Sequence, residues 1–303
     1  MKHRPLRGIV PPLVTPLLGS DKLDVQGLER LIEHVIAGGV HGLFILGTTG
    51  EAQSLSYRLR AELIERTCAQ VAGRLPVLVG ITDTSLTESE TLAAKAATCG
   101  ADAVVSAQPY YYAAAQPELI YFYSQLADRL PLPLFLYNMP SHTKVSFEPA
   151  TVRRLAEHKN IVGVKDSSAN GAYFQKLCYE LREVKDFTLL VGPEEMMAET
   201  VLLGGHGGVN GGANIFPKLY VELYNAAVAR SFEKIVPLHS RVMQISRELY
   251  SVGKHSSSYL KGVKCALSLK GICSDFMAEP FESFNAPERE VVRQALERIG
   301  TID

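Results

Sequence analysis

The chain has 303 residues, 47% of them hydrophobic, which is enough for one large domain with a sizeable core or for two ordinary ones. Its 31 Lys and Arg residues nearly balance its 32 Asp and Glu residues, giving a formal net charge of -1. This balance argues against a general nucleic-acid-binding protein, which needs a basic surface to displace counterions from phosphates.

The composition also bears on location. No run of about 18 uncharged apolar residues occurs, so we expect no membrane-spanning helix. The first segment is basic, but it contains Pro5, Pro11 and Pro12 and lacks the unbroken apolar stretch of a signal peptide. We therefore expect a cytoplasmic protein. The five cysteines are scattered without C-x-x-C spacing, which indicates reduced, buried thiols.

Eight short apolar runs alternate with longer amphipathic segments along the chain. Successive runs begin roughly 20 to 35 residues apart, which is the length of one strand–helix unit. Each run is continuous rather than alternating, as is typical of parallel strands that are buried on both faces. The runs occupy residues 8–14, 42–46, 77–81, 103–107, 132–137, 161–165, 187–191 and 207–209.

The segments between the runs have the periodicity of helices. Leu28, Leu31, Ile32 and Val35, for example, fall on one helical face. Glycines stand before several runs, where they can end a helix in the left-handed conformation. Eight strands alternating with helices predict a (β/α)8 TIM barrel of about 225 to 250 residues. A doubly wound sheet is the alternative, but no G-x-G-x-x-G follows the first run.

The strand pattern stops at about residue 228. The segments 235–249, 256–269 and 287–298 have helical spacing instead. We therefore predict a catalytic barrel in residues 1–227 and a C-terminal helical extension in residues 228–303.

Barrel enzymes carry their chemistry at the carboxyl ends of the strands, so the residues that close the runs are the first candidates for a site. Lys165 closes the run 161–165, and apolar surroundings favour the neutral, nucleophilic form of an amine. A lysine that only forms a salt bridge is the alternative. The same tripeptide, Gly-Val-Lys, also ends at Lys264, whose neighbours have helical spacing, so we expect that lysine to be structural.

Polar groups close other runs. Tyr137 ends the run before that of Lys165, and a phenol beside an imine can carry protons, although an isolated tyrosine is more often a core residue. Thr48 and Thr49 stand between two glycines, where N–H groups and hydroxyls together can hold a carboxylate. The eight histidines show no H-x-H or H-x-x-x-H pairing, which argues against a metal-dependent aldolase.

Three motifs in this order resemble the signatures of the dihydrodipicolinate synthase / N-acetylneuraminate lyase family, and the likeness covers essentially the whole chain. They are Gly47-Thr48-Thr49-Gly50-Glu51, Tyr137-Asn138-Met139-Pro140 and Gly163-Val164-Lys165.

The resemblance implies a class I aldolase mechanism with no cofactor or metal, in which the lysine forms a covalent imine with a 2-oxo acid. Lys165 would be that nucleophile, and Tyr137 would relay protons with help from Thr48. Gly47, Thr48 and Thr49 would hold the substrate carboxylate, and Glu51 would orient their turn. Tyr111 matches a second catalytic tyrosine that in many members reaches into a neighbouring subunit, which implies a homo-oligomer, either a dimer or a tetramer.

Two departures from the family pattern bear on the substrate. Synthases of this family generally have arginine where His142 stands, and a histidine cannot grip a second carboxylate with a two-pronged contact; Lys144 lies two residues further on. The sequence Gly192-Pro193-Glu194-Glu195 resembles the acidic turn of sialic acid lyases, which binds substrate hydroxyls, although acids also suit a helix N-terminus. Gly211 replaces the serine of those lyases.

The sequence therefore favours reversible aldol cleavage of a 2-oxo-3-deoxy sugar acid, or a related hydroxy-oxo acid, to pyruvate plus an aldehyde. Three alternatives stay open: a 4-hydroxy-tetrahydrodipicolinate synthase that condenses pyruvate with aspartate semialdehyde, a dehydratase of 2-oxo-3-deoxy acids, and a non-catalytic protein that binds an oxo acid. Besides the carboxylate-binding turn, the predicted substrate contacts are His142, Gly192, Glu194, Glu195, Asn210 and Gly211.

Overall fold

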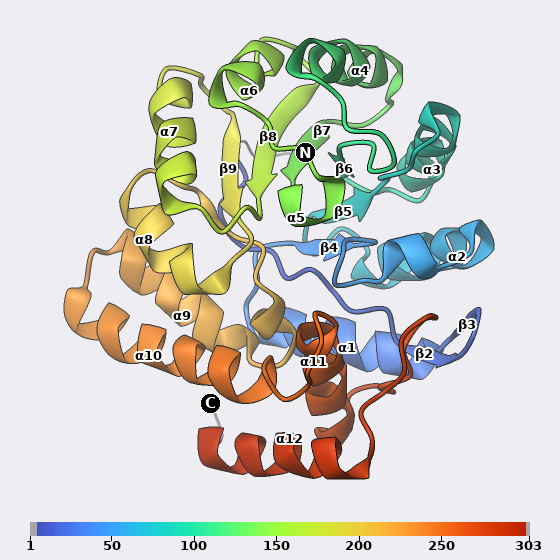
Figure 1. Cartoon of the computed structure of the whole chain (residues 1–303), viewed down its shortest axis with the longest axis vertical. Coiled ribbons are helices and arrows are strands. Elements are labelled where there is room, and N and C mark those ends of the chain that lie inside the picture. The colour runs from blue at the N-terminus through green and yellow to red at the C-terminus, as the bar shows by residue number, and fades with distance from the viewer. Residues whose placement is uncertain (1–4, 301–303) are drawn as a thin grey trace.

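A parallel sheet of eight strands, in the order β1-β10-β9-β8-β7-β6-β5-β4, forms the centre of the computed structural model, which describes residues 5–300 (Figure 1). The N-terminal segment closes this sheet into a barrel. Pro12 pairs with Phe44 of β4 in parallel, and the Leu13 N–H donates to the Phe44 carbonyl oxygen at 2.8 Å. Helices alternate with the strands and surround them (Figure 1). The predicted (β/α)8 TIM barrel is therefore confirmed.

Each of the eight predicted runs overlaps one barrel strand, and two of the strands, β7 and β8, extend one residue beyond their runs. The barrel strands are β1 (Gly8–Ile9), β4 (Leu43–Ile45), β5 (Val77–Gly80), β6 (Ala103–Ala107), β7 (Leu134–Asn138), β8 (Ile161–Asp166), β9 (Thr188–Val191) and β10 (Gly207–Gly208). The sequence did not predict the small antiparallel hairpin of β2 (Leu17–Gly19) and β3 (Lys22–Leu23).

The helices of the barrel lie between and after these strands. They are α1 (Val25–Ala37), α2 (Tyr57–Val71), α3 (Leu86–Thr98), α4 (Gln116–Arg129), α5 (Pro140–Thr143), α6 (Pro149–Leu155), α7 (Gly171–Leu181), α8 (Met197–Leu202) and α9 (Pro217–Val228), with short 3-10 helices η1 (Ala52–Ser54), η2 (Glu194–Met196) and η3 (Gly211–Asn214). Gly39 and Gly100 have φ of 81° and 86°, so glycine ends α1 and α3 in the left-handed conformation, as predicted.

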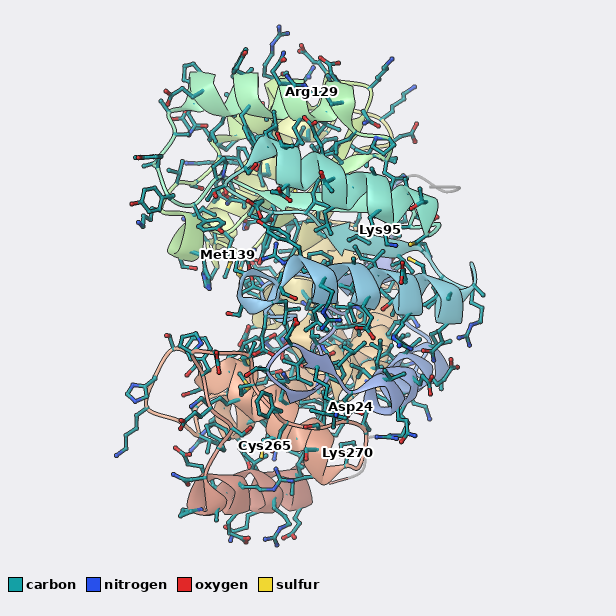
Figure 2. All side chains as sticks on the ribbon, turned by 90° about the vertical axis from the view of Figure 1, so that its right-hand side faces the viewer. Asp24, Lys95, Arg129, Met139, Cys265 and Lys270 are labelled. Atoms are coloured by element: carbon teal, nitrogen blue, oxygen red, sulfur yellow. The ribbon has the colours of Figure 1, made fainter. Side chains whose placement is uncertain are left out.

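Three further helices form the C-terminal region: α10 (Phe232–Leu249), α11 (Ser258–Leu269) and α12 (Ala286–Ile299). Figure 2 shows this region, marked by Cys265 and Lys270, at the end of the molecule opposite Arg129 of α4. The predicted division at residue 227 falls one residue before the end of α9, and it stays a prediction. Within residues 5–300, no helix is both long enough and apolar enough to span a membrane.

The core has two parts. The larger part lies between the strands and the helices, where the buried faces of the helices pack. The smaller part fills the barrel with side chains that point inward from the strands, including Phe44, Phe135, Tyr137 and Leu190. The barrel interior is therefore a core filled with side chains, and the polar groups of the site lie at the carboxyl ends of the strands.

Candidate active site

Lys165 and Tyr137 lie side by side on neighbouring strands. They are partners in the register of β8 and β7, and each side chain is only 5% exposed. The Lys165 Nζ lies 4.0 Å from the centre of the Tyr137 ring and 4.9 Å from the centre of the Phe44 ring. The amine is therefore held between two aromatic faces at the carboxyl end of the barrel, beside a phenol.

Thr48 completes this group from the turn after β4. Its Oγ1 lies 3.1 Å from the Tyr137 hydroxyl. Burial alone would raise the pKa of Tyr137, but the positive charge of Lys165 and hydrogen bonds with Thr48 and Ser167 outweigh it, so this pKa lies below its ordinary value. A phenol with a lowered pKa, next to an amine, is suited to move protons.

The turn of Gly47 to Glu51 is tightly folded above the inner core. The Gly50 N–H donates to the Gly47 carbonyl oxygen at 3.1 Å, and the Thr15 hydroxyl donates to the Gly50 carbonyl oxygen at 2.7 Å. A side chain at Gly47 would have its Cβ 2.6 Å from the Phe44 ring. Glycine is needed at Gly47 because the turn lies directly on the ring that also contacts Lys165.

A buried ion pair connects this turn to the C-terminal region. Lys264 of α11 is fully buried, and its Nζ lies 2.5 Å from Glu51 Oε1 and 2.6 Å from the Phe276 carbonyl oxygen. The other Glu51 oxygen accepts from the Ala278 N–H at 2.7 Å. These contacts agree with the structural roles that the sequence predicted for Lys264 and Glu51.

Asp166 and Asn138 stabilise the strand ends behind the lysine. The Asn138 amide donates to Asp166 Oδ1 at 2.8 Å, and both side chains are fully buried. Burial raises the pKa of Asp166, while hydrogen bonds from Asn138 and Ser168 partly oppose this. The pair holds the ends of β7 and β8 in a fixed register, which fixes the spacing of Tyr137 and Lys165.

Glu194 is a buried carboxylate in η2 with internal partners at both oxygens. Its Oε1 accepts from the hydroxyls of Tyr220 at 2.5 Å and Tyr250 at 2.7 Å, and its Oε2 accepts from the Gly212 N–H at 2.9 Å. Burial raises its pKa to about 7, against the opposing effect of these hydrogen bonds. The structure thus gives Glu194 a role in holding the turn after β10, and its predicted contact with substrate hydroxyls stays a prediction.

The other residues predicted to contact substrate near Glu194 also form contacts within the protein. Glu195 Oε1 accepts from the Ser246 hydroxyl of α10 at 2.6 Å. The Asn210 amide donates to the Gly192 carbonyl oxygen at 3.0 Å, while its own oxygen is buried without a partner in the described part of the chain. A Cβ at Gly192 would lie 2.1 Å from the Ser167 hydroxyl, so this glycine allows two strand ends to meet.

Tyr259, near the start of α11, reaches the same place and was missed by the sequence analysis. Its hydroxyl lies 3.3 Å from Thr49 Oγ1 and would lie 1.7 Å from a Cβ at Gly211. Tyr259 lies in the segment 256–269, and the helical spacing of that segment does not show which part of the barrel it meets. The one signal that could have found it is Gly211, a glycine where the resemblance led us to expect serine.

His142 and Tyr111 lie outside this group. His142 is exposed on α5, and its Nδ1 lies 2.9 Å from the Ser141 hydroxyl. Tyr111 follows β6, is 71% exposed, and packs edge-on against Tyr112, which is 78% exposed. The isolated chain therefore does not bring Tyr111 to Lys165.

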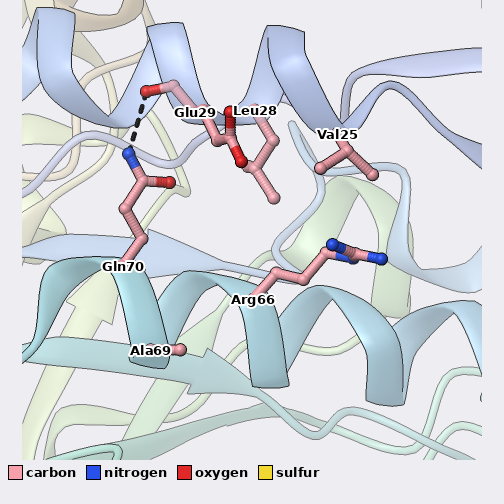
Figure 3. Close-up of a pocket in the computed structure, with 6 residues that line it drawn as sticks. All are labelled: Val25, Leu28, Glu29, Arg66, Ala69 and Gln70. Carbon is pink, nitrogen blue, oxygen red and sulfur yellow. Dashed lines mark hydrogen bonds between the residues drawn. The ribbon is translucent and has the colours of Figure 1, made fainter.

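Two further observations limit where a site can be. Within residues 5–300, no three His, Cys, Asp or Glu side chains lie close enough together to hold a metal ion. A pocket lies between α1 and α2, on the outside of the barrel (Figure 3). Its volume is about 510 Å³. It is lined by Val25, Leu28, Glu29, Arg66, Ala69 and Gln70. None of these is a strand-end residue, so we assign the chemistry to the Lys165 group instead.

Comparison with known proteins shows the family of the chain. The sequence matches the dihydrodipicolinate synthetase family over residues 5–299. A 4-hydroxy-tetrahydrodipicolinate synthase from Methanopyrus kandleri is 32% identical over 299 residues, covering 98% of this chain and 97% of the relative.

Solved structures give the same result. The structure of dihydrodipicolinate synthase from Bacteroides thetaiotaomicron superposes with a TM-score of 0.96 at 64% identity, covering 98% of this chain and 99% of the other. A prophage protein of the dihydrodipicolinic acid synthase family from E. coli K12, solved in complex with pyruvate, has a TM-score of 0.91 at 30% identity, with 97% and 99% covered. The likeness extends over both the barrel and the C-terminal helices.

Proposed function

The chain belongs to the dihydrodipicolinate synthetase family of pyruvate-dependent lyases, and we propose that it acts through an imine between Lys165 and the ketone of pyruvate. The observation that carries this proposal is the position of the Lys165 amine against Tyr137, whose hydroxyl faces Thr48.

In the proposed reaction the neutral amine attacks the ketone carbon, the C=O bond breaks, and the oxygen leaves as water as the C=N bond forms. Tyr137 and Thr48 move the protons that this exchange requires. Thr48 and Thr49 bind the carboxylate and so hold the ketone carbon beside the amine. Loss of a proton from the methyl carbon then gives the nucleophile that forms a new carbon–carbon bond with an aldehyde. We infer no cofactor or metal for these steps.

For the aldehyde we propose aspartate semialdehyde, which makes the enzyme a 4-hydroxy-tetrahydrodipicolinate synthase. The names of the relatives fit this alternative better than the cleavage of a 2-oxo-3-deoxy sugar acid that the sequence favoured. Glu194 points the same way. Its two oxygens already accept hydrogen bonds from Tyr220, Tyr250 and Gly212, which leaves less capacity for the hydroxyls of a sugar tail.

His142 supports the cleavage reaction as the second candidate. His142 is exposed, but desolvation by the atoms around its ring still lowers its pKa. The ring is therefore mainly neutral at neutral pH and offers a second carboxylate neither a charge nor a two-pronged contact. Lys144, exposed and in the left-handed conformation two residues on, is the nearest cation along the chain and would have to replace the missing arginine.

Trapping with borohydride tests the imine. The protein incubated with pyruvate and sodium borohydride should gain one reduced adduct, which peptide mass spectrometry should locate at Lys165, and Lys165→Ala should gain none. An adduct at Lys264 would overturn the assignment.

Two assays run in parallel decide between the candidates. One measures condensation of pyruvate with aspartate semialdehyde, and the other measures pyruvate release from 2-oxo-3-deoxy sugar acids, N-acetylneuraminate and 4-hydroxy-2-oxoglutarate. Condensation supports the synthase, and release from a sugar acid supports the second candidate. An imine without turnover in either assay would indicate a protein that only binds an oxo acid.

We also propose a homo-oligomer, a dimer or tetramer, in which the exposed pair Tyr111 and Tyr112 meets a second copy. Two adjacent exposed aromatic rings are costly in water and are typical of a surface that another chain covers. Light scattering gives the molar mass of the wild type and of the double variant Tyr111→Ser/Tyr112→Ser. The wild type should be a dimer or tetramer and the variant should be smaller, and a monomeric wild type would refute the proposal. A cytoplasmic location stays a prediction.

A further inference from the structure

Tyr259 links the C-terminal region to the turn that we assign to the substrate carboxylate. Its hydroxyl lies 3.3 Å from Thr49 Oγ1, within hydrogen-bonding distance, although 210 residues separate the two along the chain. Thr49 itself is 6% exposed. The contact therefore joins a buried threonine of the site to a residue outside the predicted barrel.

Glycines make room for this tyrosine. A Cβ at Gly211 would lie 1.7 Å from the Tyr259 hydroxyl, and a Cβ at Gly212 would lie 1.9 Å from the Tyr220 hydroxyl. Neither distance is possible between real atoms, so any larger residue at Gly211 would displace the tyrosine ring. The absence of a side chain at Gly211 is thus the condition under which Tyr259 can stand beside Thr49.

The ring of Tyr259 is also held from its other side. Tyr250 packs against it edge-on, with ring centres 4.8 Å apart and planes at 77°, and the Tyr250 hydroxyl is fixed by Glu194. Burial, and next the negative charge of Glu194, raise the pKa of Tyr259 well above its ordinary value. The hydroxyl therefore stays protonated and can donate a hydrogen bond across the working pH range.

The direction of the hydrogen bond follows from the substrate. A carboxylate only accepts hydrogen bonds, so a threonine hydroxyl that binds it must point its single hydrogen at it. The Thr49 oxygen is then free to accept, and the tyrosine hydroxyl is the group beside it that can donate. The chain of donors runs from Tyr259 to Thr49 to the substrate.

We propose that Tyr259 is a positioning residue, which donates to Thr49 Oγ1 and so keeps the Thr49 hydrogen directed at the carboxylate of the 2-oxo acid. This inference rests on the proposed function, in which Thr49 holds that carboxylate. Glycine is required at position 211 because the Tyr259 hydroxyl occupies the space that a side chain there would need. Helix α11 of the C-terminal region thereby supplies a residue that supports the substrate-binding site.

The test separates binding from chemistry, with pyruvate as the varied substrate. Tyr259→Phe should raise the KM for pyruvate about 3- to 10-fold, the worth of one neutral hydrogen bond, while kcat changes less than about 2-fold. Tyr224→Phe is the matched control, because Tyr224 lies on α9 and its ring packs against His41 rather than against Thr49. The control should leave both constants unchanged.

A double-mutant cycle distinguishes positioning from a merely structural contribution. In a Thr49→Val background, Tyr259→Phe should have no further effect on KM, because the hydroxyl it acts through is gone. Gly211→Ala should raise KM at least as much as Tyr259→Phe, whereas Gly19→Ala, where an added Cβ meets nothing within 4 Å, should have no effect. Circular dichroism of each variant checks that the fold is retained.

The outcomes are distinguishable from failure of the proposed function. A wild type that forms no borohydride adduct with pyruvate would overturn both proposals. A wild type that forms the adduct at Lys165, with Tyr259→Phe unchanged in KM or strictly additive with Thr49→Val, would overturn the role of Tyr259 alone.

Discussion

Replacement of Lys264 by methionine should destabilise the protein strongly, because it leaves a buried carboxylate without its partner. The Lys264 side chain is fully buried, the Glu51 side chain is 3% exposed, and their charged atoms are 2.5 Å apart. Without the lysine, the Glu51 carboxylate keeps, among residues 5–300, one hydrogen bond, from the Ala278 N–H. Removing one partner of a buried ion pair costs about 3–5 kcal/mol, a large part of the ~5–15 kcal/mol that stabilises a typical protein.

Urea unfolding followed by circular dichroism, at one protein concentration, measures this cost. Lys254→Met, at an exposed lysine that follows α10, is the matched control and should cost less than about 0.5 kcal/mol. Glu51→Gln combined with Lys264→Met should recover a substantial part of the loss, since no charge is then buried. If Lys264→Met costs less than about 1 kcal/mol, or if the double variant is less stable than the single one, the structural role of this pair is refuted.

Three further predictions concern the site and its surroundings. Tyr137→Phe should lower kcat about 10²- to 10⁴-fold with the circular dichroism spectrum unchanged, and an unaltered rate would remove Tyr137 from proton transfer. Glu194 has a folded-state pKa of about 7, above its ordinary 4.5, so its contribution to stability is complete below about pH 4.5 and is lost as pH rises through 7. The urea midpoint of Glu194→Gln should not decline in this way as pH rises. If the midpoints of the variant and the wild type change in parallel with pH, Glu194 is not the cause. Burial lowers the pKa of His206 to about 4, and its Nδ1 accepts a hydrogen bond from the Leu189 N–H. Protonation of this ring therefore favours the unfolded chain, and the free energy of unfolding of the wild type should fall by up to about 3 kcal/mol as pH falls from 6.5 to 4. His206→Asn should flatten this loss, unless another group causes it.

The barrel could be predicted because its strands have a distinctive pattern in the sequence. Parallel strands covered on both faces require continuous apolar runs, and each of the eight runs overlaps a strand. The hairpin of β2 and β3 was missed because it has only five strand residues and one exposed face, too few for a periodic signal. Strand ends then located Lys165, Tyr137 and Thr48 in one place, since parallel strands bring their carboxyl ends to one edge.

Contacts between distant segments could not be predicted in this way. An acidic pair at a turn reads the same whether it faces solvent or is buried, so nothing in the sequence revealed that Tyr220 and Tyr250 hydrogen-bond Glu194. The role of Tyr259 could not be predicted for the same reason. Helical spacing shows which side of α11 is apolar, but it does not show which turn of the barrel that side contacts. Tyr111 depends on a second chain, and no pattern within one chain describes that surface.

The first strand of the barrel pairs with the last one, so the barrel cannot close until most of the chain has been synthesised. Pro12 finds its partner Phe44 early, but Gly8 pairs with Gly207, which the ribosome adds much later. At 5–20 residues per second, the first strand waits about 10 to 40 seconds for its second neighbour, and the growing sheet keeps open edges throughout that time. We therefore expect the nascent chain, rather than the finished enzyme, to be the form most exposed to aggregation and most dependent on chaperones.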